Sequence, residues 1–319
     1  MMMRICLLLL TAGILSPASS GQESVHEQFT QAFLLEQQGQ FEPAVHSFQL
    51  LVESDALSLA ERGRALTLLG YAYRETGRYQ ESQSAYERAL SIFEGDAQYR
   101  EDYANALDCF AGLSRSTGQS EAASRMWLQA LDIYKEQNDH RGIARTYANL
   151  AGLAMEQNHV SAAKSSIEKA VAETKVAKDF TDDDLALICE TQAWVVSVNG
   201  DHKSAIAGYQ HTLDLRKHSH GDHFPLTGWS YLILGRAYAA NGQIEQALMN
   251  MREGLTILEQ TEGSRSPRYL TGEILYSQAL DQSGSHGEAS RLRASAQQSL
   301  SDLYRKQCVG CTLSASSFR

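Results

Sequence analysis

The sequence predicts an all-α protein in which about seven helix–turn–helix units stack into a right-handed α-α superhelix, a solenoid. Three observations predict this fold: a helix-breaking residue recurs at a nearly constant interval, small residues flank it at fixed distances, and apolar residues follow with helical spacing. The intervals between successive breakers are 38, 41, 40, 42, 42 and 42 residues. The breakers are Gly39, Gly77, Gly118, Asn158, Gly200, Gly242 and Gly284.

Small residues mark the places where the two helices of each unit must approach closely. One set stands seven positions before the breakers and consists of Ala32, Gly70, Ala111, Ala151, Ala193, Gly235 and Ser277. The other stands five positions after them and consists of Ala44, Ser82, Ala123, Ala163, Ala205, Ala247 and Ala289. Nine positions after each breaker comes a bulky apolar residue, except in the last unit, which has Arg293. We therefore expect the second helix of the last unit to be a solvated cap.

The first twenty residues have the pattern of a secretory signal peptide. Arg4 supplies a short positive region, Ile5–Leu15 is mostly apolar, and Ser16–Ser20 contains the small residues typical of a cleavage site. We expect cleavage near Ser20 and an exported protein, either periplasmic or secreted. An uncleaved membrane anchor is the alternative, but the apolar run is shorter than the ~20 residues that a spanning helix needs. We expect no stable membrane insertion after cleavage.

The formal net charge of -10 bears on the class of partner. Binding to nucleic acid depends mostly on lysine and arginine side chains that neutralise phosphates. An acidic chain is therefore not expected to bind nucleic acid.

Two units carry the residues of a known repeat most clearly. They contain Gly70-Tyr71-Ala72-Tyr73 with Gly77-Arg78-Tyr79 and Ala89-Leu90, and Gly235-Arg236-Ala237-Tyr238 with Gly242, Ala247 and Leu255. This arrangement resembles the tetratricopeptide repeat family over residues 24–306. The period near 42 residues is similar to the longer-helix subtype of kinesin light chains, and His220–Pro225 resembles the inter-repeat loop of that subtype. We expect a signal peptide at 1–20, a solenoid at 21–306 and a tail at 307–319.

The resemblance implies a groove that is lined by the first helix of each unit and binds a protein or an extended or helical peptide. The family's groove positions, transferred by register, are Arg64, Tyr71, Arg74, Asn105, Asp108, Arg115, Arg145, Met155, Glu190, Trp194, Trp229 and Arg236. Arginine and tryptophan concentrate binding energy in interfaces, and arginines bind carboxylates well. Two alternatives remain open. Each arginine could be a solvated helix residue paired with a neighbouring acid, and Trp194 and Trp229 could belong to the core.

Histidines and cysteines are the candidates for metal or redox chemistry. His218, His220 and His223 with Asp222 could suggest zinc, but their spacing is irregular, and we interpret the segment as a polar turn, with no metal expected. In an oxidising compartment, the pair Cys308-Val309-Gly310-Cys311 is expected to form a small disulfide, with metal binding or a redox role as alternatives. Cys109 and Cys189 lie two units apart and are expected to be buried thiols.

Patterns typical of enzymes are not found in this sequence. It has no Gly-rich phosphate loop, no His-Glu-x-x-His helix and no Gly-x-Ser-x-Gly turn. Asp182-Asp183-Asp184 precedes an apolar run, where carboxylates favour a helix N-terminus. We expect no catalysis and no cofactor, and we interpret the chain as an exported adaptor that binds a partner in its groove. A structural or self-assembling envelope component is the alternative, and a metal- or redox-active protein is the third hypothesis.

Overall fold

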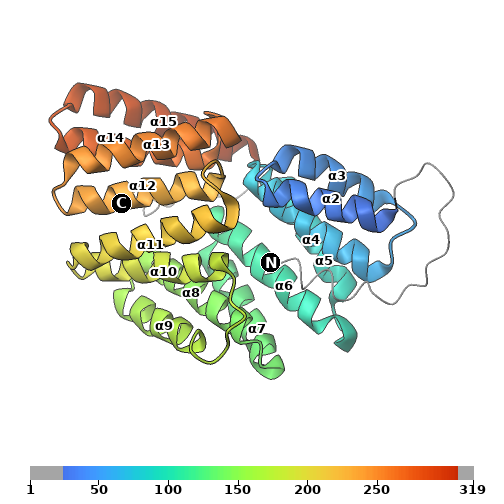
Figure 1. Ribbon diagram of the computed structural model, residues 1–319. Coiled ribbons are helices and arrows are strands. Elements are labelled where there is room, and N and C mark those ends of the chain that lie inside the picture. The colour runs from blue at the N-terminus through green and yellow to red at the C-terminus, as the bar shows by residue number, and fades with distance from the viewer. Residues whose placement is uncertain (1–23, 308–319) are drawn as a thin grey trace.

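The structure is a computed structural model that describes residues 24–307. This part of the chain contains fourteen α-helices and the short 3-10 helix Ala97–Tyr99 (Figure 1). The α-helices form seven sequential pairs, here called units 1 to 7, which confirms the predicted all-α solenoid. The first helices are α2 (Val25–Gln37), α4 (Leu59–Glu75), α6 (Arg100–Ser116), α8 (His140–Glu156), α10 (Asp182–Val198), α12 (Pro225–Ala240) and α14 (Pro267–Gln282). The second helices are α3 (Phe41–Glu53), α5 (Tyr79–Phe93), α7 (Ser120–Gln137), α9 (Val160–Glu173), α11 (His202–His220), α13 (Ile244–Glu262) and α15 (His286–Gln307).

The turn inside each unit has a backbone conformation that the breaker residues make possible. All seven breakers have a positive φ, from 60° at Asn158 to 88° at Gly200 and Gly284. In unit 1, the Gln40 amide donates a hydrogen bond to the Leu35 carbonyl at 2.9 Å. The same bond, from an amide to the carbonyl five positions earlier, recurs in most of the other units. It satisfies a carbonyl that the helix end leaves free, and glycine or asparagine adopts the required left-handed conformation at little cost. The predicted register of turns is confirmed.

The predicted small residues lie at the contact between the two helices of each unit. All seven members of the set that follows the breakers are fully buried. In unit 6, a Cβ atom added at Gly235 would lie 2.5 Å from Met251 Cγ, and in unit 2 the Ser82 hydroxyl donates to the Gly70 carbonyl at 2.6 Å. The core therefore runs through the array as a series of interlocked helix pairs.

Several first helices begin at a residue with a clear local signal. Ser24, Ser58 and Thr181 each form a capping box at the start of α2, α4 and α10. Prolines Pro225 and Pro267 occupy the first position of α12 and α14, where a missing amide hydrogen costs nothing. None of the helices in residues 24–307 is long and apolar enough to cross a membrane.

The two ends of the described array contact each other. The turn at Gly39 in unit 1 packs against Phe224 and Pro225, which lie at the start of unit 6. The turn at Gly77 in unit 2 packs against Pro267 and Leu303 of unit 7. Figure 1 shows the end of α15 beside the N-terminal helices. Units that are five apart in the sequence are thus neighbours in space.

Ion pairs and rings join the same ends. Arg268 on α14 donates to Glu75 Oε2 on α4 at 2.6 Å and also pairs with Glu262 at the end of α13. The Tyr304 ring on α15 stacks on Tyr79 of α5, with centroids 5.6 Å apart. We call these contacts, together with those of the two glycine turns, the closing contact.

The expectation of a solvated last helix is correct only for part of α15. Arg293 lies half-exposed and donates to the Ser277 hydroxyl at 3.1 Å. Further along the helix, Ala296 and Leu300 are buried, and Tyr304 packs against unit 2. The polar sequence of α15 did not predict this burial, because the C-terminal end of the helix packs against unit 2.

Candidate partner-binding face

The first helices of neighbouring units contact one another and share one face of the solenoid. Direct packing joins α2 to α4, α4 to α6, α8 to α10, and α12 to α14. The twelve residues predicted to bind a partner all lie on five of these helices, from α4 to α12. We call the surface that they define the first-helix face.

Four of the five predicted arginines already have a carboxylate partner in the structure. Arg64 binds Asp102 with two hydrogen bonds of 2.8 Å. Arg74 pairs with Glu75 at 2.8 Å and Arg115 with Glu156 at 2.7 Å. Arg145 pairs with Asp108, also at 2.8 Å. For these four side chains the structure shows the pairing with neighbouring acids that the sequence left as an alternative.

Two glycines on the first-helix face make room for two of these arginines. A Cβ atom at Gly112 would lie 2.5 Å from Arg74 Nη1, and one at Gly152 would lie 3.3 Å from Arg115 Nη2. Each guanidinium therefore lies over the backbone of the next first helix. Sequence reasoning missed these glycines, although both stand at the same register position, one residue after a predicted small residue.

Asn105, Asp108 and Arg145 form a polar cluster between units 3 and 4. The buried Asp108 carboxylate accepts hydrogen bonds from Trp127 Nε1 at 2.9 Å and from Arg145 Nε at 2.8 Å. The Asn105 side-chain oxygen accepts a hydrogen bond from the Tyr134 hydroxyl at 3.0 Å. Because each acceptor is already used within the chain, this cluster fastens two units together.

Met155 was placed wrongly on an accessible surface. Its side chain is 7% exposed and packs in the core with Ala144, Ile167 and Val195. Asp108, at 8% exposed, is likewise too buried to meet a partner directly. Both residues occupy groove positions by register, but each packs against the second helix of its own unit and the next first helix.

Trp194, Trp229 and Arg236 lie together on α10 and α12 and remain partly exposed. The Arg236 guanidinium lies over the Trp194 ring, 5.7 Å from its centroid. Trp229 Nε1 donates to Glu190 at 3.3 Å, and Glu190 also accepts from Arg216 at 2.9 Å. Among residues 24–307 no carboxylate forms an ion pair with Arg236, which separates it from the other predicted arginines.

A second group of charges surrounds Tyr71 near the end of α4. The Arg74 guanidinium lies over the Tyr71 ring, 4.7 Å from its centroid. Burial raises the pKa of Tyr71 well above its usual value, with a further contribution from Glu75. Glu36, at the end of α2, is 5% exposed, and burial, followed by the charge of Glu75, raises the pKa of its carboxyl to about 8. No feature of the sequence pattern singles out Glu36.

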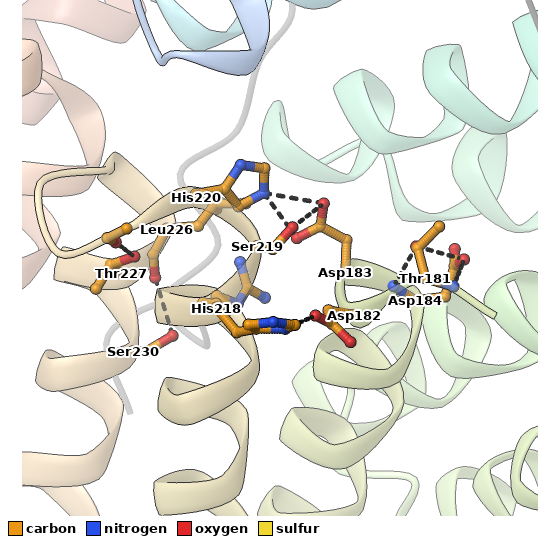
Figure 2. Close-up of polar contacts among 12 residues, drawn as sticks. Thr181, Asp182, Asp183, Asp184, His218, Ser219, His220, Leu226, Thr227 and Ser230 are labelled. Carbon is orange, nitrogen blue, oxygen red and sulfur yellow. Dashed lines mark hydrogen bonds and ion pairs between the residues drawn. The ribbon is translucent and has the colours of Figure 1, made fainter. Parts of the chain in front are cut away.

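The histidines at the end of α11 bind the aspartates at the start of α10 (Figure 2). His218 Nδ1 contacts Asp182, and His220 Nε2 lies 2.8 Å from Asp183 Oδ1. The His220 ring is nearly buried and stacks on Phe224. Within residues 24–307, no three His, Cys, Asp or Glu side chains are arranged to hold a metal ion. These pairs thus join α10 to α11, and the aspartates do more than favour a helix N-terminus.

Of the four cysteines that follow the predicted signal peptide, two lie among the described residues and two do not. Cys109 and Cys189 are free, half-buried thiols, and burial raises the pKa of Cys109 to about 12, which disfavours its reactive thiolate. The proposed pair Cys308 and Cys311 and the signal peptide at 1–20 lie outside the described residues.

Two segments of the chain, residues 63–96 and 195–260, match the sequence pattern of the tetratricopeptide repeat. The match to the tetratricopeptide repeat covers these two segments, which together are less than half of the chain. They cover the helix pair of unit 2, the second helix of unit 5 and the helix pair of unit 6. No curated protein matches the sequence.

Solved structures with a similar array of tetratricopeptide repeats include three Rap proteins. The apo form of RapI has a TM-score of 0.60 at 14% identity, covering 87% of this chain and 99% of RapI. The Rap conjugation gene regulator of plasmid pLS20, in complex with the Phr* peptide, has a TM-score of 0.69 at 11% identity, covering 96% and 84%. A Rap protein complexed with competence and sporulation factor has a TM-score of 0.54 at 14% identity, covering 89% and 96%. At these identities the likeness shows the fold alone.

The likeness to a kinesin light chain is too distant to test the predicted subtype. The repeats of a putative kinesin light chain from Podosopora anserina have a TM-score of only 0.35 at 17% identity, covering 78% of this chain and 99% of that chain. The subtype therefore stays a prediction.

Proposed function

We propose that this protein is a non-catalytic adaptor whose first-helix face binds a peptide or a protein segment that carries a carboxylate. The observation that carries the proposal is the state of Arg236. Its guanidinium lies over the Trp194 ring, yet it has no ion-pair partner among the described residues, while the other predicted arginines are neutralised. A partner's carboxylate would complete this site.

The chemistry of the three side chains suits such a segment. A guanidinium and a carboxylate form short, charge-assisted hydrogen bonds, and two tryptophan rings offer a large apolar area beside them. Glu190 is held by hydrogen bonds from Arg216 and Trp229. Two of the similar Rap structures contain a bound peptide or factor, and this likeness of fold supports the same mode of use.

A peptide library tests the proposal directly. The purified chain is presented with short peptides, each paired with a counterpart in which Asp and Glu are replaced by Asn and Gln. We expect the selected peptides to be acidic and the Arg236→Ala variant to bind them about tenfold more weakly, the effect of one lost charge-assisted hydrogen bond.

Arg125→Ala is the matched control, because Arg125 is an exposed arginine on the second helix α7. It should leave binding unchanged. Equal loss in both variants would indicate a general effect of net charge, and no loss at Arg236 would remove it from the binding site.

One observation favours the alternative of a structural or self-assembling component. Leu50 on α3 and Met249 on α13 are exposed at 59% and 65%, and both lie on second helices. Sedimentation velocity over a range of concentrations decides between the two proposals. Self-association that disappears in a Leu50→Gln/Met249→Gln double variant would favour assembly through the second helices.

Export is a further part of the proposal, supported by the sequence of residues 1–20. The mature protein would then begin after Ser20. The intact mass of the protein purified from its own host tests this, and a mass that includes residues 1–20 would contradict cleavage.

A further inference from the structure

In the closing contact, the turns of units 1 and 2 are each covered by the unit five places further along the chain. The Gly39 turn of unit 1 is covered by the start of unit 6, and the Gly77 turn of unit 2 is covered by unit 7. The offset is five units in both cases. By the same rule, the Gly118 turn of unit 3 would be covered by whatever chain follows unit 7.

The end of α15 already reaches unit 3. The Tyr304 hydroxyl donates to the Ser116 carbonyl at 3.4 Å, while its ring stacks on Tyr79. The helix ends three residues later, at Gln307. The last turn of α15 therefore lies near the end of α6, two residues before Gly118.

A cleft lies at this place. It has a volume of about 380 Å³ and is bounded by α5 and by the end of α6 with its following turn. Phe110 and Leu113 supply an apolar floor. Gln83 of α5, with Ser114 and Thr117 of α6 and its turn, offers amide and hydroxyl groups at the sides. Such a cleft can hold apolar side chains while its polar groups bond to an extended backbone.

Residues 308–319 have a suitable length and composition. Twelve residues can extend to about 40 Å, so a segment anchored at Gln307 can cover the whole cleft. Val309, Leu313 and Phe318 are apolar and match the floor of the cleft.

We propose that residues 308–319 of the same chain cover the Gly118 turn and fill this cleft, in the place that an eighth unit would take. This contact extends the rule of five-unit neighbours by one step. It caps the array with the segment that follows α15, and it is independent of the partner proposed for the first-helix face.

Site-specific photo-crosslinking tests the proposal in the full chain. A benzophenone amino acid replaces Gln83, an exposed residue that lines the cleft. The control probe replaces Ser165, an exposed residue on α9, far from α15 in the sequence. Trypsin releases the tail as one peptide, 307–319, because Lys306 precedes it and the next basic residue is Arg319.

We expect the probe at position 83 to capture this peptide and the probe at position 165 not to capture it. A mixture of isotopically labelled and unlabelled chains shows whether the crosslink lies within one chain. Crosslinks between labelled and unlabelled chains would show that a second copy fills the cleft, and failure to capture the tail peptide from position 83 would overturn the proposal.

Hydrogen exchange gives a second readout that needs no probe. A chain that ends at Gln307 should exchange the amides of residues 113–119 about tenfold faster than the full chain, with α9 unchanged. Equal exchange in the two chains would contradict a docked tail.

Discussion

Glu36 and Glu75 are both buried carboxylates near the first-helix face, yet their pKa values move in opposite directions. Burial alone would raise both. At Glu75, Arg268 and Arg74 outweigh burial and lower the pKa to about 2. At Glu36, the charge of Glu75 adds to burial, Arg74 opposes it only in part, and the pKa rises to about 8. One Glu36 oxygen also has no hydrogen-bond partner among the described residues.

The raised pKa of Glu36 predicts a specific dependence of stability on pH. The folded carboxyl keeps its proton up to about pH 8, whereas the unfolded one loses it near 4.5. Between these values the folded state binds more protons, so Glu36 makes the free energy of unfolding fall as pH rises. Glu36→Gln should remove this fall and stabilise the fold above pH 8 by roughly 1–3 kcal/mol.

Urea unfolding at several pH values measures this effect. Glu53→Gln is the control, because Glu53 is an exposed carboxylate on α3. If the stabilities of the Glu36→Gln variant and the wild type change in parallel with pH, Glu36 is ionised in the folded protein.

At the scale of the element, the closest approach of two helices in unit 6 depends on glycine. A Cβ atom added at Gly254 of α13 would lie 2.5 Å from the Gly228 carbonyl oxygen of α12. A backbone oxygen cannot move aside as a flexible side chain can. The two helices would have to separate, and their packing would be lost over several residues.

Gly254→Ala should therefore destabilise the protein by about 1–3 kcal/mol, the usual effect of overpacking. Gly287→Ala in α15 is the matched control, because a Cβ atom there meets nothing within 4 Å. The control should be neutral or stabilise by up to about 1 kcal/mol, since alanine favours a helix. Thermal unfolding of both variants checks the pair, and equal stability would mean that α12 and α13 adjust freely.

The helices and turns could be predicted from the sequence, but the residues that individual side chains contact could not. The turns were predictable because each requires a residue that tolerates positive φ. The small residues were predictable because the contact between the two helices recurs at the same positions in every unit. The carboxylate partners of Arg115 and Arg145 come from a neighbouring unit, 41 and 37 positions away, and depend on how two units are rotated. Register placed Trp194 and Trp229 on the first-helix face, where both are partly exposed, while Met155 shows that register alone does not fix exposure.

At the scale of the whole molecule, Arg268 is the charged centre of the closing contact. It pairs with Glu75, 193 positions away in the sequence, and with Glu262. Both carboxylates are almost fully buried. Such contacts could not be read from the sequence, because they depend on small rotations summed over five units.

Arg268→Ala would leave the buried Glu262 without its ion-pair partner and Glu75 with Arg74 alone, which costs about 3–5 kcal/mol if the ends stay together. Separation of the ends lets water reach both groups. We therefore expect a lower melting temperature and a larger radius of gyration in small-angle X-ray scattering. Arg100→Ala, which breaks an exposed pair with Glu136 inside unit 3, should change neither. An unchanged radius would mean that the tyrosine and proline contacts suffice to hold the ends.

The closing contact also changes how such a chain is expected to fold. In an open repeat array each unit touches only its neighbours, so the terminal units fray first and unfolding spreads inwards. Here the described end units also support units five places away, which couples the two ends into one cooperative transition. Arg268 and Glu75 are 193 positions apart, so the chain must lose the conformational entropy of closing a large loop before their contact can form. The docking of the two ends is therefore expected to be the last and slowest step of folding.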